Sequence, residues 1–340
     1  MQREKEGTQG MRENWKRWLW AGLLCIAMMA AAACKPLPGQ ESAAAGYTVT
    51  DERGTEVSFA AKPERILTLS MSTDEVVLGL VEPEKLAAVN ALLDDPVSSN
   101  VTELVKNIPQ RVRYPSVEEI ASLKPDLVIM PDWGDVSKAD SLRDLGIPVV
   151  VCKGAKNREE IESSIQMIAA AVGEPERGRI LCQKMNDKLA QIQAATQEIP
   201  ESERKSVVLL SLMKSYGGIG CSFDEACRLA GVRNGMAELG IHTGQAMTKE
   251  QLVRINPDYL FLPTYTNNGT YDVTEFRDEY LKDPALAGMK AIRNHGLREP
   301  NESYIYNCSQ DFAFGVQEIA YQVYGDKFKQ PAGQHLSALE

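Results

Sequence analysis

The chain has 340 residues and a formal net charge of −10. An acidic chain is poorly suited to bind nucleic acid, because that role needs a basic surface that neutralises phosphates. The length exceeds what one hydrophobic core comfortably fills and fits two lobes.

The N-terminus reads as an export signal at residues 1–33. Basic residues precede an uncharged, almost wholly apolar run at 18–33, which at sixteen residues is slightly short for a membrane span. Small residues lead up to Cys34, which resembles a bacterial lipoprotein cleavage site with Cys34 as the lipidated first residue. Ala31 departs from this pattern, because such sites usually carry Leu there. A plain secretory signal cleaved near Ala33 is the alternative.

The stretch at 34–46 is rich in Pro, Gly, Ser and Ala, which predicts a flexible tether.

Beyond the signal the chain holds 32 Lys and Arg against 44 Asp and Glu, a net charge of −12. Its remaining cysteines show no metal-binding spacing, so we expect buried free thiols, although Cys221 and Cys227 could pair locally. They are Cys152, Cys182, Cys221, Cys227 and Cys308.

Strands and helices alternate from residue 47 onwards, which predicts parallel α/β sheets. A hairpin at 47–59 comes first. The first lobe, 47–156, then has expected strands at 64–70, 85–92, 127–130 and 149–152 and helices at 73–81, 117–123 and 137–145.

A helical segment at 157–200 separates two such alternating regions. Its second helix, 177–197, places apolar residues on one face and spans roughly 30 Å at about 1.5 Å per residue, enough to join two lobes as a strut. The second lobe, 201–328, has expected strands at 207–213, 259–262 and 303–307 and helices at 224–230, 249–255, 274–282 and 312–324. The tail, 329–340, is expected to fray.

One motif occurs twice, 132 positions apart. Residues 116–131 read SVEEIASLKPDLVIMP and residues 248–263 read TKEQLVRINPDYLFLP. Each copy predicts a Ser or Thr helix cap, a short helix ended by Pro, and a strand buried on both faces. The repeat therefore predicts two similar lobes, unless a common helix-to-strand connection recurs by chance.

The order of these segments resembles one known family. A lipoprotein-like signal, Y-T-V-T-D-x-x-G, P-E-R-I-L-T-L-S, the two repeat copies, a long helix between them and a terminal helix are together similar to the periplasmic binding proteins for cobalamin and ferric siderophores. Those proteins are solute receptors of ABC importers. The resemblance spans residues 46–328 and implies two Rossmann-like α/β lobes joined by one rigid helix, with the ligand in the cleft between them.

The resemblance also implies that Glu118 and Glu250, one in each repeat copy, form salt bridges with Arg residues of two permease subunits. A carboxylate in a helix's first turn is stabilised by the helix dipole in any case, and this is the simpler explanation. Two such carboxylates at matching points would nevertheless present paired anions to a pseudo-symmetric partner. We expect Asp126 and Asp258, between helix and strand, to be structural.

Open α/β sheets bind ligands at the carboxyl ends of their strands, so the loops there form the expected cleft. Trp133 is the only Trp beyond the signal, and Tyr216 and Tyr265 lie in loops with Gly or Asn, where they could stack on a large ligand. Loop packing is the alternative for each aromatic residue. Met71 and Asn307 complete the expected ligand contacts.

Catalytic motifs are absent: the sequence has no G-x-S-x-G, P-loop or H-E-x-x-H, and only three His. We therefore expect no enzyme, no cofactor and no protein-held metal, with an exported hydrolase as a distant alternative. A receptor for a free metal ion is the nearer alternative, but it would need more imidazole or thiolate ligands.

The expected function is capture of a metal chelate and delivery to an ABC permease dimer with its ATPase, on the outer face of the cytoplasmic membrane and with a lipid anchor. The cleft loops supply Lys153, Lys156 and Lys214 but no Arg. Because acidic siderophores favour Arg, this composition favours a corrinoid, haem or hydroxamate chelate.

Overall fold

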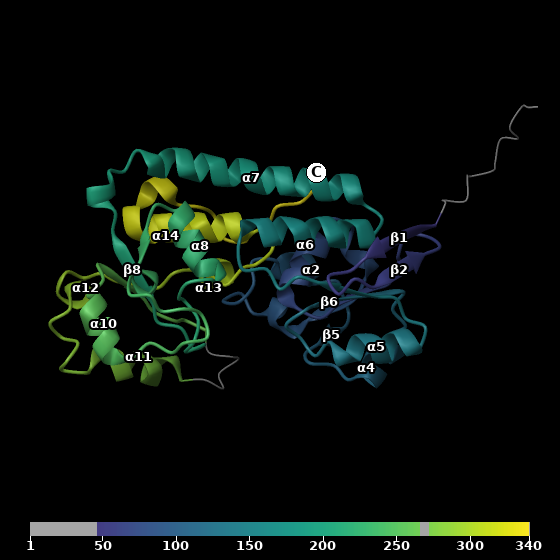
Figure 1. Ribbon diagram of the computed structural model, residues 1–340, viewed down its shortest axis with the longest axis horizontal. Coiled ribbons are helices and arrows are strands. Elements are labelled where there is room, and N and C mark those ends of the chain that lie inside the picture. The colour runs from purple at the N-terminus through teal and green to yellow at the C-terminus, as the bar shows by residue number, and fades with distance from the viewer. Residues whose placement is uncertain (1–45, 266–271, 340) are drawn as a thin grey trace, which may run out of the picture. The chain divides into compact units, whose positions relative to one another are not determined.

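The computed structural model describes residues 46–265 and 272–339. The predicted signal, Cys34 and most of the tether lie outside these residues. The described chain opens with the expected antiparallel hairpin of β1 (Tyr47–Thr50) and β2 (Glu56–Phe59), and its turn includes Gly54 at φ 78°. Two parallel sheets follow, one in each half of the chain (Figure 1).

The first sheet has five parallel strands in the order β5-β4-β3-β6-β7. Its central strands are continuous buried runs, as a sheet covered by helices on both faces requires. The strands are β3 (Ile66–Thr68), β4 (Leu86–Asn90), β5 (Arg111–Val112), β6 (Leu127–Pro131) and β7 (Val149–Cys152).

The second sheet has four parallel strands in the order β11-β10-β8-β9. Its strands are β8 (Ser206–Leu209), β9 (Arg233–Asn234), β10 (Tyr259–Phe261) and β11 (Leu297–Arg298). The predicted fold class, two α/β lobes joined by a long helix, is confirmed. The exact domain boundaries stay a prediction.

Helices cover both sheets. Those of the first half are α2 (Met71–Leu78), α3 (Thr102–Val105), α4 (Val117–Ser122), α5 (Ser137–Asp144) and α6 (Arg158–Ala171). Those after the connecting helix are α8 (Ser222–Leu229), α9 (Gly235–Glu238), α10 (Lys249–Ile255), α11 (Val273–Leu281), α12 (Lys290–Arg293), α13 (Glu302–Ile305) and α14 (Phe312–Tyr324). Single 3-10 turns lie at Pro83–Lys85, Ala91–Asp94, Glu201–Glu203 and Asp326–Phe328.

The connecting helix is α7 (Pro175–Gln197), which begins at a proline, a residue suited to a helix's first position. It runs above α6 of the first lobe and α14 of the second (Figure 1). Its buried face belongs to a hydrophobic cluster that includes Ile66 and Val150 of the first lobe and Phe261 and Phe312 of the second. The side of the fold nearest α7 is therefore one core shared by both lobes, whereas the far face of each sheet packs on a smaller cluster of its own lobe.

One predicted strand is wrong. Residues 303–307 were expected to pair in a sheet, but Glu302–Ile305 is the helix α13 and the strand lies earlier, at Leu297–Arg298. The side chain of Asn301 accepts the backbone N–H of Ser303 and starts the helix. Such a local cap overrides the strand-like alternation of the apolar residues that follow it.

The tail is not frayed up to residue 339, contrary to the prediction. The backbone N–H of Leu336 donates to the carboxylate of Asp311, and His335 Nδ1 lies 2.7 Å from the same group. The N–H of Ala338 donates to the carbonyl of Gly79. The tail is therefore hydrogen-bonded to both lobes. Its few apolar residues gave no sign in the sequence that it would be ordered.

All five cysteines in the described chain are free, as expected, and Cys221 and Cys227 are not paired. In the same part of the chain, no helix is both long and apolar enough to cross a bilayer.

Candidate functional site

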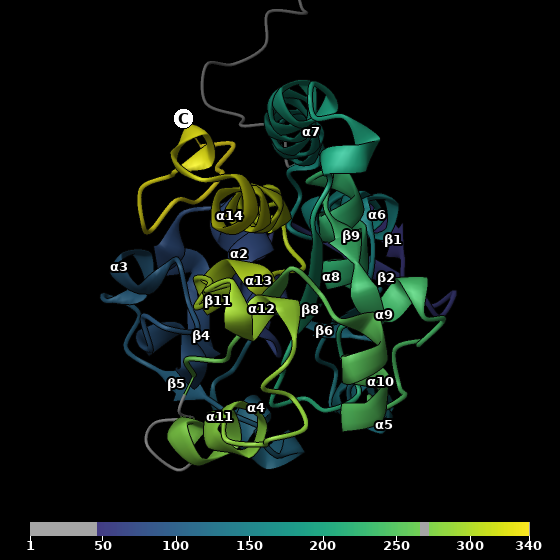
Figure 2. The same cartoon turned by 90° about the vertical axis from the view of Figure 1, so that its left-hand side faces the viewer.

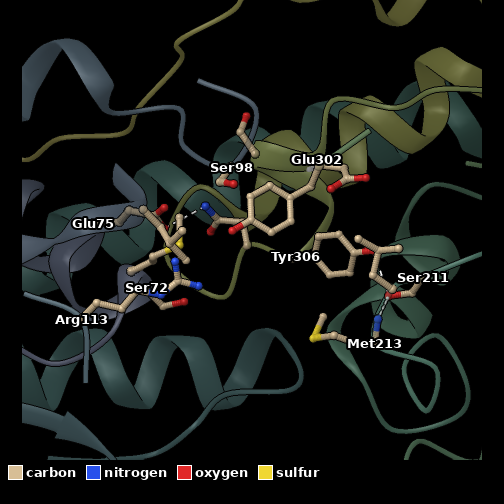
Figure 3. Close-up of a pocket in the computed structure, with 14 residues that line it drawn as sticks. Ser72, Glu75, Ser98, Arg113, Ser211, Met213, Glu302 and Tyr306 are labelled. Carbon is tan, nitrogen blue, oxygen red and sulfur yellow. Dashed lines mark hydrogen bonds between the residues drawn. The ribbon is translucent and has the colours of Figure 1, made fainter. Parts of the chain in front are cut away.

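A cavity of about 460 Å³ lies between the two lobes, with residues from both in its wall (Figure 3). The first lobe contributes Met71, Ser72, Glu75, Leu92, Ser98 and Arg113. The second contributes Ser211, Leu212, Met213, Tyr265, Glu302, Ser303, Tyr306 and Asn307.

The cavity lies where the strands end, as open α/β sheets lead one to expect. Two residues separate β3 from helix α2, and the second of them is the cap residue Ser70, whose side chain accepts the N–H of Thr73. Met71, the first residue of α2, therefore lies at the cavity. The loop after β8 is longer than the sequence suggested. That strand ends at Leu209 and not at 213, which frees Ser211–Met213 to form part of the wall.

The wall is mostly apolar, with hydroxyl groups between the apolar side chains. Two methionines, Met71 and Met213, come from opposite lobes, and the phenol of Tyr306 donates to Ser211 Oγ at 3.0 Å. Burial raises the pKa of Tyr306, so this phenol stays neutral. Polarizable thioethers and aromatic rings of this kind suit a large organic ligand with a few hydrogen-bonding groups.

Three charged residues also line the cavity. Arg113 is exposed, whereas Glu75 and Glu302 are buried, at 2% and 7% relative exposure. Glu302 accepts the backbone N–H of Thr264 at 2.5 Å, and burial raises its pKa. Burial and the nearby Asp311 raise the pKa of Glu75 well above its ordinary value. The cavity therefore carries less negative charge than its two Glu residues suggest.

The predicted ligand contacts divide into two groups. Met71, Tyr265 and Asn307 line the cavity. Tyr216 lies behind the wall, with its ring 5.2 Å from that of Tyr306 and its hydroxyl 2.7 Å from Ser222 Oγ. Trp133 is 69% exposed and is not among the lining residues. A ligand-binding role for any of the five stays a prediction.

Sequence reasoning missed Arg113, Glu75 and Tyr306. Arg113 follows a strand of two residues, too short to recognise from a pattern. Tyr306 fell within the wrongly predicted strand. Glu75 did leave a signal, because an acidic residue on the apolar face of a short helix calls for a special partner. The presence of Arg113 also removes the basis for expecting a cleft without Arg.

The two predicted docking residues occupy equivalent exposed positions. Glu118 and Glu250 lie in the first turns of α4 and α10, each helix capped reciprocally through Ser116 and Thr248. Hydrogen bonds from their own backbone N–H groups and from these caps lower the pKa of both carboxyls, so both are charged. Figures 1 and 2 place α4 and α10 on the side of the fold away from α7.

Asp126 and Asp258 are structural, as expected. The Asp126 carboxylate accepts the backbone N–H groups of Glu64 and Arg65 at 2.7 and 2.8 Å. The Asp258 carboxylate accepts the N–H of Ser206 at 2.9 Å. Each aspartate thus ties the repeat to the neighbouring strand of its own sheet.

The family model described as periplasmic binding protein matches residues 66–301, most of the chain and both lobes around the cavity. The chain belongs to the periplasmic binding protein family. The predicted resemblance is confirmed, and a periplasmic binding protein works outside the cytoplasm, as expected. Members of this family bind solutes for transport.

Individual relatives agree with this membership. This chain is 26% identical over 325 residues to the uncharacterized ABC transporter substrate-binding lipoprotein YvrC of Bacillus subtilis. The match covers 92% of this chain and 98% of YvrC. The chain is 24% identical over 267 residues to the Fe(3+)-citrate-binding protein YfmC of the same organism, covering 75% and 78%. Its fold is similar to that of the periplasmic heme-binding protein RhuT from Roseiflexus, with a TM-score of 0.66, 23% identity and coverage of 77% and 98%.

Proposed function

We propose that this periplasmic binding protein captures a metal chelate in the interlobe cavity and delivers it to an ABC import permease. The observation that carries the proposal is the apolar, methionine- and tyrosine-lined cavity built from both lobes. A bare metal ion would need clustered ligands, and the described residues hold no group of three or more His, Cys, Asp or Glu that could supply them. A chelate needs shape, stacking and a few hydrogen bonds instead.

The class of chelate follows from the charges at the cavity. Arg113 offers a cation to an acidic group of the solute, and both buried Glu residues have raised pKa values. Haem and ferric citrate, the solutes in the names of two relatives, carry carboxylates that would suit Arg113. A corrinoid remains a further candidate, since its large flat body suits the thioether and aromatic wall.

Delivery rests on features outside the cavity. Glu118 and Glu250 supply a spaced pair of exposed carboxylates for two permease subunits, and an ATPase would drive import. Lipid on Cys34 would hold the receptor at the outer face of the cytoplasmic membrane. The function needs neither a catalytic residue nor a resident cofactor. Mass spectrometry of the native N-terminus tests the anchor, and an unacylated chain that starts elsewhere would remove it.

The solute is tested by titrating the purified protein with cyanocobalamin, haemin and ferric citrate, one at a time, by calorimetry. We expect at least one Kd below about 1 μM, which corresponds to roughly −8 kcal/mol. Met213→Glu should weaken that binding at least tenfold, because Met213 is 52% exposed and lines the cavity. Val253→Glu is the matched control, 43% exposed and away from the cavity. Binding of a free metal ion or a small polar solute, with none of the chelates, would refute the proposal.

A further inference from the structure

Glu75 connects the two lobes at the cavity wall. It belongs to α2 of the first lobe, and its Oε2 accepts a hydrogen bond from Asn307 Nδ2 of the second lobe at 2.8 Å (Figure 3). Gln310 Nε2, also of the second lobe, donates to the backbone carbonyl of Glu75 at 2.8 Å. The carboxyl group is thus fixed from the second lobe while its residue lines the cavity.

The orientation of Asn307 decides which group Glu75 meets. Asn307 Oδ1 accepts the backbone N–H of Ser309 at 2.8 Å, and the hydroxyl oxygen of Ser309 lies 2.7 Å from it. Its oxygen is therefore occupied, and only the NH₂ group can face Glu75. One oxygen of Glu75 is an acceptor for this NH₂ group, so a proton on the carboxyl belongs on the other oxygen.

The surroundings of Glu75 disfavour a charge. In the part of the chain that the structure describes, no Lys or Arg forms an ion pair with it. Ser309 and Asn307 favour the ionised form through hydrogen bonds, but burial and the Asp311 carboxylate raise the pKa more strongly. The titratable and charged groups that face this region are Asp74 on α2, Glu302 and Tyr304 on α13, Cys308 and Asp311 before α14, His335 on the tail, and Arg113 at the cavity wall.

We propose that Glu75 keeps its proton at neutral pH and presents a hydrogen-bond donor to the cavity, with Asn307 holding the carboxyl in place. A protonated carboxyl offers one donor beside the oxygen that Asn307 occupies. The solute that takes this bond would place an acceptor such as a carbonyl, amide or carboxylate oxygen against α2. This step rests on the proposed solute site, and it makes solute affinity fall as pH rises and Glu75 ionises.

The protonation state can be measured without any solute. Infrared difference spectra of the protein against Glu75→Gln at neutral pH should show the carbonyl band of a protonated carboxyl that disappears in the variant. Asp74→Asn is the matched control, because Asp74 is buried, accepts the N–H of Asn90 at 3.0 Å and the hydroxyl of Thr68, and does not line the cavity. Burial raises the pKa of Asp74 to about 8, so its own band must be separated. A spectrum without a Glu75 band overturns the inference.

Solute binding supplies the second readout, with whichever of the three chelates binds. The ratio of wild-type to Glu75→Gln affinity should fall about tenfold as pH rises and Glu75 ionises, because the Gln amide keeps a donor at every pH and the ionised Glu loses it. The ratio cancels the titration of the chelate itself. Asp74→Asn should keep the fall in affinity with rising pH but move it to lower pH, because the Asp74 carboxylate helps to raise the pKa of Glu75. If Glu75→Gln loses as much affinity as Glu75→Leu, a charge is required and the inference fails.

The two proposals fail separately. If the wild-type protein binds none of the chelates, the proposed function is refuted, and the infrared band alone then decides whether Glu75 presents a donor. A chelate that binds with the same pH profile in wild type and Glu75→Gln leaves the function intact and overturns the role of Glu75.

Discussion

The two copies of the repeat have nearly the same backbone and different surroundings. Both begin with a reciprocal cap and place a Glu at the second helical position, Glu118 in α4 and Glu250 in α10. Both then pass through a residue with positive φ before the proline, Lys124 at 50° and Asn256 at 47°. The two copies differ after their strands end. Trp133 is exposed, whereas Tyr265, 132 positions later, lines the cavity.

This difference separates what the repeat does for folding from what it does for binding. The cap, the proline and the aspartate recur because each lobe must start one buried strand next to another. The residues after the strand are under no such constraint, so one lobe can direct its aromatic residue towards the cavity and the other towards solvent. Four experiments test this separation.

The largest effect should come from the shared exposed carboxylates. Glu118→Ala with Glu250→Ala should abolish solute uptake in cells, since exposed charges govern association with a charged partner, while Kd for the solute changes less than about twofold. Glu103→Ala with Glu238→Ala, an exposed pair with one residue in each lobe, is the control and should transport normally. Loss of solute binding in the first double variant would contradict a docking role.

The strand-end aromatics should differ next. Tyr265→Ala should weaken the tightest chelate about tenfold, because one aromatic contact contributes about 0.5 to 1.5 kcal/mol beyond the area it buries. Trp133→Ala should reduce the affinity for the chelate less than Tyr265→Ala does. Any loss of affinity in Trp133→Ala measures the contact of the Trp133 ring with the solute. Calorimetric titration of both variants gives the comparison. An equal or larger loss of affinity in Trp133→Ala would show that Trp133 contacts the solute although it does not line the cavity.

The structural aspartates should affect stability and not binding. Asp126→Ala should lower the free energy of unfolding by about 1 to 2 kcal/mol, because two backbone N–H groups lose their acceptor. Asp258→Ala should cost somewhat less, since it loses one N–H and the weaker hydroxyl contact of Ser206 at 3.2 Å. Urea denaturation measures both. A change in solute Kd with unchanged stability would reverse this assignment.

The positive-φ positions should show the smallest effect. Lys124→Gly should stabilise the protein by about 0.5 to 1 kcal/mol, because a left-handed backbone strains Lys and suits Gly. Asn256→Gly should give no gain, since Asn tolerates this conformation and its Oδ1 accepts the N–H of Lys290 at 2.8 Å. The midpoint of thermal unfolding distinguishes the two. Stabilisation at both sites would mean that the Asn256 contact contributes nothing.

The sequence predicted most of the fold because its strongest signals are local. The buried strands, the caps of α4 and α10, the long α7 and the terminal α14 all follow from periodicity, Pro and capping residues. The tail was predicted wrongly because contacts distant in sequence order it, with Asp311 and Gly79. The strand expected at 303–307 failed for a local reason, the cap that Asn301 gives to α13.

The candidate site was predictable in position and only partly in composition. Strand ends located Met71 and Tyr265 because the topology alone brings such loops together. Asn307 does line the cavity, but it follows the helix α13 and not the strand expected at 303–307. Arg113, Met213 and Tyr306 depend on where short or misassigned elements end, and no periodic pattern marks those ends. Glu75 could have been noticed as a buried acid, but its partner Asn307 lies 232 positions away.

The core that both lobes share along α7 also bears on how the protein unfolds. Side chains of both sheets and of α6, α7 and α14 form one contiguous apolar cluster. Separating the lobes would expose that cluster to water, at about 25 cal/mol for each Å² of apolar surface. Heat should therefore unfold the two lobes together in one cooperative calorimetric transition, and a fragment that ends before α7 should not fold by itself.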